Sequence, residues 1–150
     1  MTQYSKSQAS EARVGASFAR QGFMTTLGAA LVDVSPGVVE IELRPCPAIS
    51  QQHGFVHAGA VAAIADSAAG YAALSLMPSD RGVLTTEFKI NLVAPATGDR
   101  ILARGTVVKA GKTLTLAQTE VFAESGGQPK LVALLTATLM AIEGRDGVSD

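Results

Sequence analysis

The residue best suited to chemistry in this sequence is Asp66. It is the only Asp, Glu, Lys or Arg between residues 45 and 79, and it stands in the middle of an apolar stretch from Ala58 to Met77. An unpaired carboxylate in a buried helix is costly, and such exceptions gather at active sites as a general base or nucleophile. The simpler alternative is an Asp that turns to solvent or bonds Ser67. We favour the functional interpretation, since Gly70 one turn later leaves space beside the carboxylate.

A second candidate group is the loop from residue 50 to residue 59, which leads into this apolar stretch. The first N–H groups of a helix have no partner within the helix, and the positive end of its dipole can stabilise an oxyanion. His57 stands where this helix would begin, either as a catalytic side chain or as an N-terminal capping residue. The sequence therefore predicts an oxyanion site at the start of the helix and leaves the role of His57 open.

Composition limits the classes of protein to consider. The 150 residues suffice for one domain, and 47% hydrophobic against 17% charged residues excludes disorder and favours burial of surface in an oligomer. Twelve basic residues against thirteen acidic ones, with no Trp and 5% aromatic residues, give neither the charge nor the stacking surface that nucleic-acid binding needs. We therefore expect a small-molecule partner and no nucleic acid.

The single cysteine and the apolar stretch bear on location. Cys46 lies between two prolines, cannot form an internal disulfide and has no recognisable base nearby, so we expect it to be structural in a reducing, cytoplasmic compartment. The polar N-terminus lacks the apolar core of a signal peptide. Asp66 would cost roughly 2.5 to 3.5 kcal/mol at a bilayer centre, which an Ala-rich helix would not offset, so we expect no membrane association.

The remaining patterns predict about six strands and one dominant helix. A short helix is expected over residues 8–21, and alternating residues at 38–44 and 87–92 indicate half-buried strands. Three further extended runs cover residues 100–109, 113–124 and 130–142, and the glycine-bearing loops between them predict an antiparallel meander. Residues 1–7 and 144–150 are expected to be flexible ends of a single domain.

The apolar helix decides the predicted architecture. A helix that is apolar on every face has to be buried on all sides, and the sequence offers no second long helix to cover it. At about 30 Å it matches the width of a sheet of roughly six strands. We therefore predict an α+β fold in which an antiparallel sheet wraps around one central helix.

One motif carries a resemblance to a known family. Gln51-x-x-Gly54-x-x-His57-Ala58-Gly59, with Asp66 and Gly70 downstream, resembles the signature of hotdog-fold acyl-CoA thioesterases of the phenylacetate-pathway, PaaI-like type. The segments 85–96 and 105–113 are also similar to that family, and the likeness covers about residues 15–142. It implies a hotdog fold over the single domain 1–150.

The resemblance also implies roles for individual residues. Asp66 would be the general base or nucleophile, and the backbone N–H of Ala58, with or without that of Gly59, would polarise the thioester carbonyl. Gln51, or Gln52 in its place, would position substrate or water, and Thr85 would lie near the site. Two residues depart from the family pattern, which has Asn at position 51 and Gly at position 58. Pocket shape is expected to depend on Phe55, Tyr71, Leu74 and Met77, and contacts to the phosphates of CoA on Arg81, Arg104, Lys109 and Lys112.

The spacing of two of these residues has a geometric consequence. Ala58 and Asp66 are eight residues apart, which is about 12 Å along a helix, so they cannot both touch one carbonyl. A site that uses both must combine two subunits. The shared-site homodimer of the family has this arrangement, and a dimer of dimers would make a tetramer.

These inferences predict an acyl-CoA thioesterase that releases CoA thiol from an aryl or medium-chain acyl group. CoA enters only as part of the substrate, and no metal or other cofactor is implied. A hotdog hydratase or dehydratase is a weaker alternative, because those relatives pair their acid with a differently spaced histidine. A non-catalytic acyl-CoA sensor is a third possibility, although 150 residues leave no room for the DNA-binding segment that such regulators usually carry.

Overall fold

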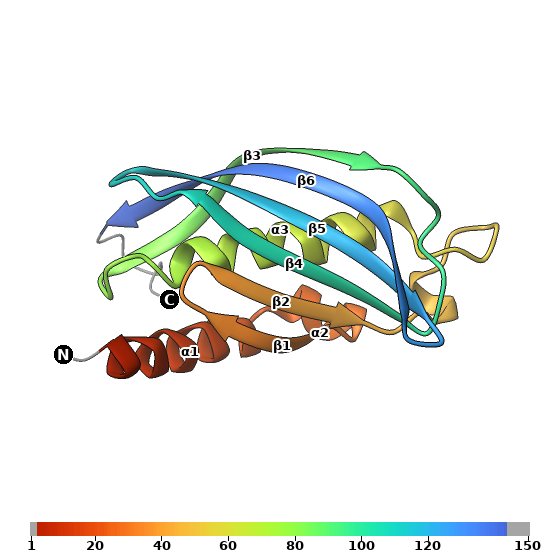
Figure 1. The fold of residues 1–150 in the computed structure, drawn as a ribbon, viewed down its shortest axis with the longest axis horizontal. Coiled ribbons are helices and arrows are strands. Elements are labelled where there is room, and N and C mark those ends of the chain that lie inside the picture. Colours follow the sequence, from red (N-terminus) through yellow and green to blue (C-terminus); the bar gives the residue numbers. More distant parts are fainter. Residues whose placement is uncertain (1–2, 144–150) are drawn as a thin grey trace.

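The computed structural model describes residues 3–143, with side chains from residue 8 onward. Six antiparallel strands form one sheet in the order β1-β2-β4-β5-β6-β3, and the helix α3 lies across one face of it (Figure 1). The strands are β1 (Ala30–Ser35), β2 (Val38–Leu43), β3 (Arg81–Leu92), β4 (Arg100–Lys109), β5 (Leu114–Ser125) and β6 (Gln128–Glu143). The helices are α1 (Gln3–Ala19), α2 (Gly22–Leu27), the short 3-10 turn η1 (Pro47–Ile49) and α3 (Ala58–Leu74). The predicted hotdog architecture is confirmed.

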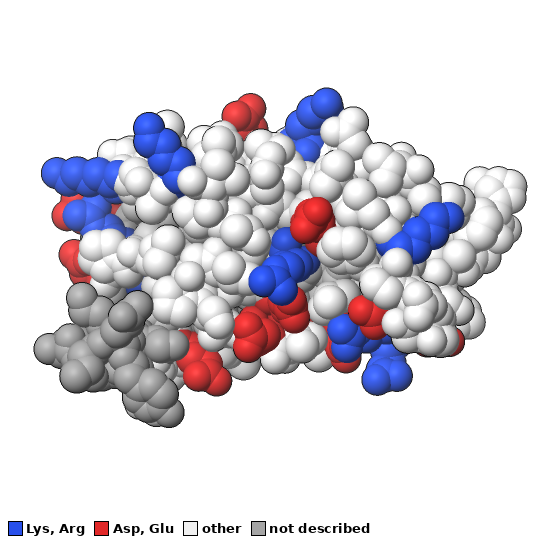
Figure 2. Space-filling model, in the orientation of Figure 1, with Lys and Arg blue, Asp and Glu red and all other residues white. Residues whose placement is uncertain are grey.

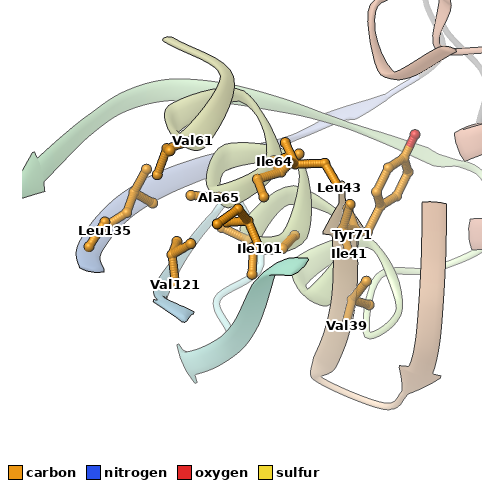
Figure 3. Close-up of a cluster of buried hydrophobic side chains, with 14 of the residues drawn as sticks. Val39, Ile41, Leu43, Val61, Ile64, Ala65, Tyr71, Ile101, Val121 and Leu135 are labelled. Atoms are coloured by element: carbon orange, nitrogen blue, oxygen red, sulfur yellow. The ribbon is translucent and has the colours of Figure 1, made fainter. Parts of the chain in front are cut away.

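The sheet encloses α3 because both surfaces are apolar where they meet. Helix α3 contacts five of the strands, β2 to β6. Inward side chains such as Ile41, Ile101 and Val121 pack around Ile64 and Ala65 of the helix, and all five are fully buried (Figure 3). This layer of small and branched side chains holds α3 at a fixed height above the sheet.

One contact between helix and sheet is much closer than the others. Gly105 of β4 lies directly beneath α3, and a Cβ atom at this position would be 2.4 Å from the backbone carbon and oxygen of Ala68. Only glycine allows the strand and the helix backbone to approach this closely. Gly105 therefore sets the distance between β4 and the part of α3 that carries Asp66.

The expectation that α3 is buried on all sides is wrong for one strip of the helix. Gly59, Ala62, Ala63, Asp66 and Gly70 remain partly or fully exposed, whereas the opposite faces are buried. These residues follow one strip along α3, and Asp66 within it bonds Thr85 of the edge strand β3. The sheet alone therefore leaves a line of small residues and one carboxylate uncovered.

Several elements differ from the sequence predictions in their presence or their bounds. Helix α1 begins at Gln3, earlier than predicted, and the rest of the supposedly flexible ends, residues 1–2 and 144–150, lies outside the described residues. The six-residue helix α2 was missed, and β3 begins at Arg81, six residues before the predicted start. Helix α1 lies beside β1 (Figure 1) and is anchored by Arg13, whose guanidinium donates to the carbonyl oxygens of Met77 and Arg81.

Strand β3 forms a free edge of the sheet. Its inward positions are set by the pairing with β6, which places Phe88, Ile90 and Leu92 opposite the buried Ala137, Leu135 and Ala133. Phe88 and Leu92 are nevertheless 46% and 52% exposed, because β3 is the last strand of the sheet within residues 3–143. Charged side chains are also scattered thinly over the face seen in Figure 2, with wide uncharged areas between them.

Candidate active site

The start of α3 presents one backbone N–H group without a partner. His57 is the N-cap, and its Nδ1 accepts the N–H of Gly59 at 2.8 Å, while its carbonyl oxygen accepts the N–H groups of Ala60 and Val61. Within residues 3–143, no acceptor receives the N–H of Ala58. The structure thus separates two donors that the sequence could not distinguish. The Gly59 N–H is used by the cap, and the Ala58 N–H is available to a ligand.

Gly59 and Ala58 meet different steric conditions. A Cβ on Gly59 would be 3.0 Å from Nδ1 of His57, so a larger residue there would press on the capping imidazole. Ala58 has no positive φ and lies at the first helical position, where any L-residue fits. The departure from Gly at position 58 therefore leaves the backbone donor in place.

The loop before α3 is a closed hairpin that brings Gln51 to the same place. The Gln51 N–H donates to the Phe55 carbonyl at 2.8 Å, and its side-chain Oε1 accepts the N–H of His53. Gln51, Phe55, His57 and Ala58 line a cavity of about 470 Å³ whose other walls are mostly apolar. Gln52 is exposed and lies outside this cavity. Of the two glutamines, the structure brings only Gln51 to the start of α3.

Asp66 lies further along α3 and is held by the sheet. Its Oδ1 accepts a hydrogen bond of 2.8 Å from the hydroxyl of Thr85 on β3. Burial raises the pKa of the Asp66 carboxyl above its ordinary value of 3.8, and the hydrogen bond from Thr85 offsets part of that rise. The alternative partner Ser67 is wrong, since the Ser67 hydroxyl donates to Gln21 instead, at 3.5 Å.

A second cavity of about 360 Å³ opens beside this carboxylate. Asp66 and Thr85 form one side of it, and the N-terminal segment forms another through Ser17 and Gln21. Sequence reasoning missed Ser17 and Gln21, because nothing local links them to a residue some fifty positions away. The remaining lining residues are Ser67, Gly70, Tyr71, Val83 and Leu84.

The two cavities lie in the same chain but share no residue. Ala58 in one and Asp66 in the other are eight residues apart on α3, or about 12 Å along the helix axis. Strand β3 borders both, with Thr85 near its start at the carboxylate cavity and Leu92 at its end beside the helix start. Each cavity therefore holds one half of the predicted catalytic groups and lies against the free edge of the sheet.

The four cations named for CoA lie elsewhere. Arg81 pairs with Glu143 at 2.8 Å and with Asp80 at 3.7 Å, while Arg104 pairs with Glu40 at 2.8 Å and lines a groove with Gln118 and Thr136. Lys109 ends β4, and Lys112 follows it in the turn to β5. None of the four lines either cavity.

Two other expectations concern pocket shape and the membrane. Phe55 and Tyr71 line the two cavities, as expected, whereas Leu74 is fully buried in the core and Met77 packs partly buried against it.

Among the helices within residues 3–143, none combines the length and the apolar character needed to cross a bilayer.

Comparisons with known proteins agree with this geometry. The model of the thioesterase superfamily matches residues 53–130. A thioesterase-family protein from Silicibacter pomeroyi is 48% identical, with a TM-score of 0.88 over 90% of this chain and 99% of that one. The E. coli PaaI protein, from the phenylacetic acid degradation operon, shares the fold at 22% identity, with a TM-score of 0.83 over 92% of this chain and 96% of PaaI. A Halobacterium salinarum protein assigned as an esterase is 29% identical over 105 residues, 67% of this chain and 69% of its own length.

The family model covers more than half of the chain, including the start of α3, Asp66 and Thr85. Taken with the hotdog fold and the two cavities beside β3, this match identifies the protein as a member of the thioesterase superfamily.

Proposed function

We propose that the protein hydrolyses acyl-CoA thioesters in sites that two identical subunits share. The observation that carries this proposal is the separation of two reactive groups on one helix. The unpaired N–H of Ala58 and the desolvated carboxylate of Asp66 occupy different cavities of one chain, and both cavities lie along strand β3.

The free edge of β3 supports a second copy as the missing element. An edge strand with unpaired backbone groups and exposed apolar side chains is a template for pairing. Phe88 and Leu92 point to the side of the sheet that carries α3, where a partner strand and helix would bury them. Pairing of β3 with β3 of a partner subunit would bury these side chains and continue the sheet.

Antiparallel self-pairing also brings the right halves together. In such a pair, the end of β3 near Leu92 lies beside the start of the partner's β3, near the partner's Thr85. The cavity at the start of α3 then faces the partner's Asp66, and the twofold axis creates the same site twice. Association of two such dimers into a tetramer stays a prediction.

The two halves supply complementary parts of thioester hydrolysis. The thioester carbonyl oxygen accepts the N–H of Ala58 and gains negative charge as the carbonyl carbon is attacked, which the positive end of the α3 dipole stabilises. In one route the partner's Asp66 takes a proton from water as the water oxygen bonds to the carbonyl carbon, and the tetrahedral intermediate then expels CoA thiolate. In the other route the Asp66 carboxylate attacks the carbonyl carbon and displaces CoA thiolate, and water then hydrolyses the resulting anhydride and restores the carboxylate. In both routes the thiolate takes up the proton released from water, which gives the free acid and CoA thiol.

The neighbouring residues hold these groups in position. Thr85 fixes one carboxylate oxygen of Asp66 and leaves the other for water or substrate. His57 caps the first turn of α3 through its bond to Gly59, and the Ala58 N–H stays available to a ligand. Gln51 borders the same cavity and presents its amide nitrogen to a ligand, because its amide oxygen is already bonded to His53.

The test measures thiol release from a panel of acyl-CoAs that includes phenylacetyl, hydroxyphenylacetyl, benzoyl and straight-chain groups. Asp66→Asn removes the base or nucleophile. Ala58→Pro removes only the proposed donor, because proline suits the first helical position and the extended His57 before it. We expect each variant alone to lose at least ~100-fold in kcat. Ala58→Gly keeps the N–H and serves as the control.

Mixing the two inactive variants tests the shared site. Refolding them together in equal amounts makes half of the dimers mixed, and each mixed dimer has one site with both groups intact. About a quarter of wild-type activity should return. A mixture as inactive as its parents would place both groups in one chain and contradict the proposal.

A further inference from the structure

The cavity beside Asp66 ends in a hydrogen-bonded cluster that thioester hydrolysis does not require. The Tyr71 hydroxyl accepts the amide N–H of Gln21 at 2.8 Å and lies 3.3 Å from the hydroxyl of Ser17. Tyr71 and Ser17 are 4% and 6% exposed, and both line the cavity. Figure 3 shows the Tyr71 hydroxyl pointing away from the apolar cluster that surrounds the ring. The inner end of this cavity is therefore both buried and polar.

The burial of this end indicates which part of a substrate it receives. The pantetheine arm of an acyl-CoA has to continue outward to the nucleotide, so it cannot stop against Ser17 and Tyr71. An acyl group ends within the site and can stop there. With the thioester carbon at Asp66, the acyl chain would follow α3 toward Tyr71, five residues or about 7.5 Å along the helix axis.

The chemistry of the lining narrows the kind of acyl group. Gln21, Tyr71 and Ser17 offer neutral donors and acceptors, and none of the described residues that line the cavity is a Lys or Arg. A carboxylate there would meet the charge of Asp66 without a cation to balance it. A plain alkyl end would cover the remaining lone pairs and N–H groups of these side chains without offering them a hydrogen bond. A hydroxyl or oxo group would offer one.

We propose that Tyr71 and Gln21 select acyl groups that carry a neutral hydroxyl or oxo substituent at the end remote from the thioester. This inference rests on the proposed thioesterase function and names the substrate class of that same site. Discrimination should be moderate, because Tyr71, Gln21 and Ser17 already satisfy one another when no substrate oxygen is present. A single neutral hydrogen bond then corresponds to roughly a tenfold preference.

The experiment compares kcat/KM for 6-hydroxyhexanoyl-CoA, hexanoyl-CoA and adipoyl-CoA. The three acyl chains have the same length and differ only at the end remote from the thioester, which is a hydroxyl, a methyl or a carboxylate. We expect wild type to prefer the hydroxy compound over hexanoyl-CoA by about tenfold and to turn adipoyl-CoA over slowest. Tyr71→Phe should reduce the preference for the hydroxy compound to within about twofold, and so should Gln21→Met, which keeps the side-chain length without the amide. Because the two variants change different residues, a folding defect in one of them does not explain a loss of preference seen in both.

The matched control is Ser10→Ala, which removes another bond between α1 and the end of α3, from the Ser10 hydroxyl to the Ser75 carbonyl, outside the cavity. It should leave the substrate preference unchanged, so that loosening of α1 is separated from loss of recognition. Equal losses on all three substrates in Tyr71→Phe and Gln21→Met would mean that the cluster is structural or contacts pantetheine, and would overturn the inference. A wild-type ratio near one between kcat/KM for 6-hydroxyhexanoyl-CoA and kcat/KM for hexanoyl-CoA would also overturn the inference. The absence of turnover with every acyl-CoA would instead overturn the proposed function, and this inference with it.

Discussion

Replacing Gly105 by alanine tests whether the spacing between β4 and α3 controls the site. The added Cβ would lie 2.4 Å from the backbone carbon and oxygen of Ala68 and 2.7 Å from the nitrogen of Ala69. An ordinary contact needs about 3.4 Å, so strand and helix must separate by about 1 Å. No flexible side chain can absorb this shift, since all three atoms belong to the helix backbone. We expect a loss of about 2 to 3 kcal/mol in the free energy of unfolding, the upper part of the range for overpacked cores.

The same displacement should reach Asp66, which lies two residues before Ala68. A movement of about 1 Å in a catalytic group can lower the rate by roughly 100-fold, so kcat should fall even where the variant is fully folded. Thermal unfolding should show a drop in Tm of about 4 to 12 °C, and thiol release should be measured well below that Tm. Gly15→Ala in α1 is the matched control, because a Cβ there meets nothing within 4 Å and alanine favours the helix. A Gly105→Ala protein with the Tm and kcat of wild type would refute the close approach.

Three further predictions concern the catalytic groups themselves. Asp66→Asn should be inactive yet more stable than wild type near pH 7. Burial raises the pKa of Asp66 in the folded protein, so wild type loses stability as the pH rises through that folded-state pKa. The difference in Tm between the two proteins should therefore vanish below the unfolded-state pKa of 3.8. Thr85→Val removes the hydrogen bond that lowers the pKa of Asp66, so the acidic limb of the plot of kcat against pH should move to higher pH. An unchanged acidic limb would mean that Thr85 does not act on the group whose titration controls kcat. His57→Asn preserves the N-cap and should keep kcat within a few-fold, whereas His57→Ala should lose about 1 kcal/mol of stability; a collapse of kcat in the Asn variant would assign chemistry to the imidazole.

The elements with strong periodicity could be predicted from the sequence. The strand at 38–43 alternates buried and half-buried residues, and the long apolar stretch starts its helix at Ala58 as predicted. Strand β1 was harder, because its exposed edge position leaves only a weak alternation. The first half of β3 was missed for a related reason. An edge strand has no neighbouring strand along one of its edges, and its residues show no clear alternation of buried and exposed positions.

Local spacing alone could predict the site only where its residues follow one another in sequence, whereas Thr85 was placed near the site by the family resemblance. Gln51, His57, Ala58 and Asp66 lie on one hairpin and one helix, so their spacing was informative. The contacts of Asp66 with Thr85 and of Tyr71 with Gln21 join separate elements, and no local pattern encodes them. The role of His57 as a cap likewise depends on the direction of its Nδ1, which a sequence does not record.

The free edge of β3 has a consequence for the newly synthesised monomer before it associates with a second subunit. Unpaired backbone groups beside exposed apolar side chains such as Phe88 and Leu92 are the usual starting point for aggregation. Self-association would protect this edge, and its extent depends on protein concentration, so the folded form would be less stable when dilute. The edge of a newly made chain would then stay exposed longest when the concentration of the protein is low. Expression level would act on solubility and yield through the same strand that borders both cavities.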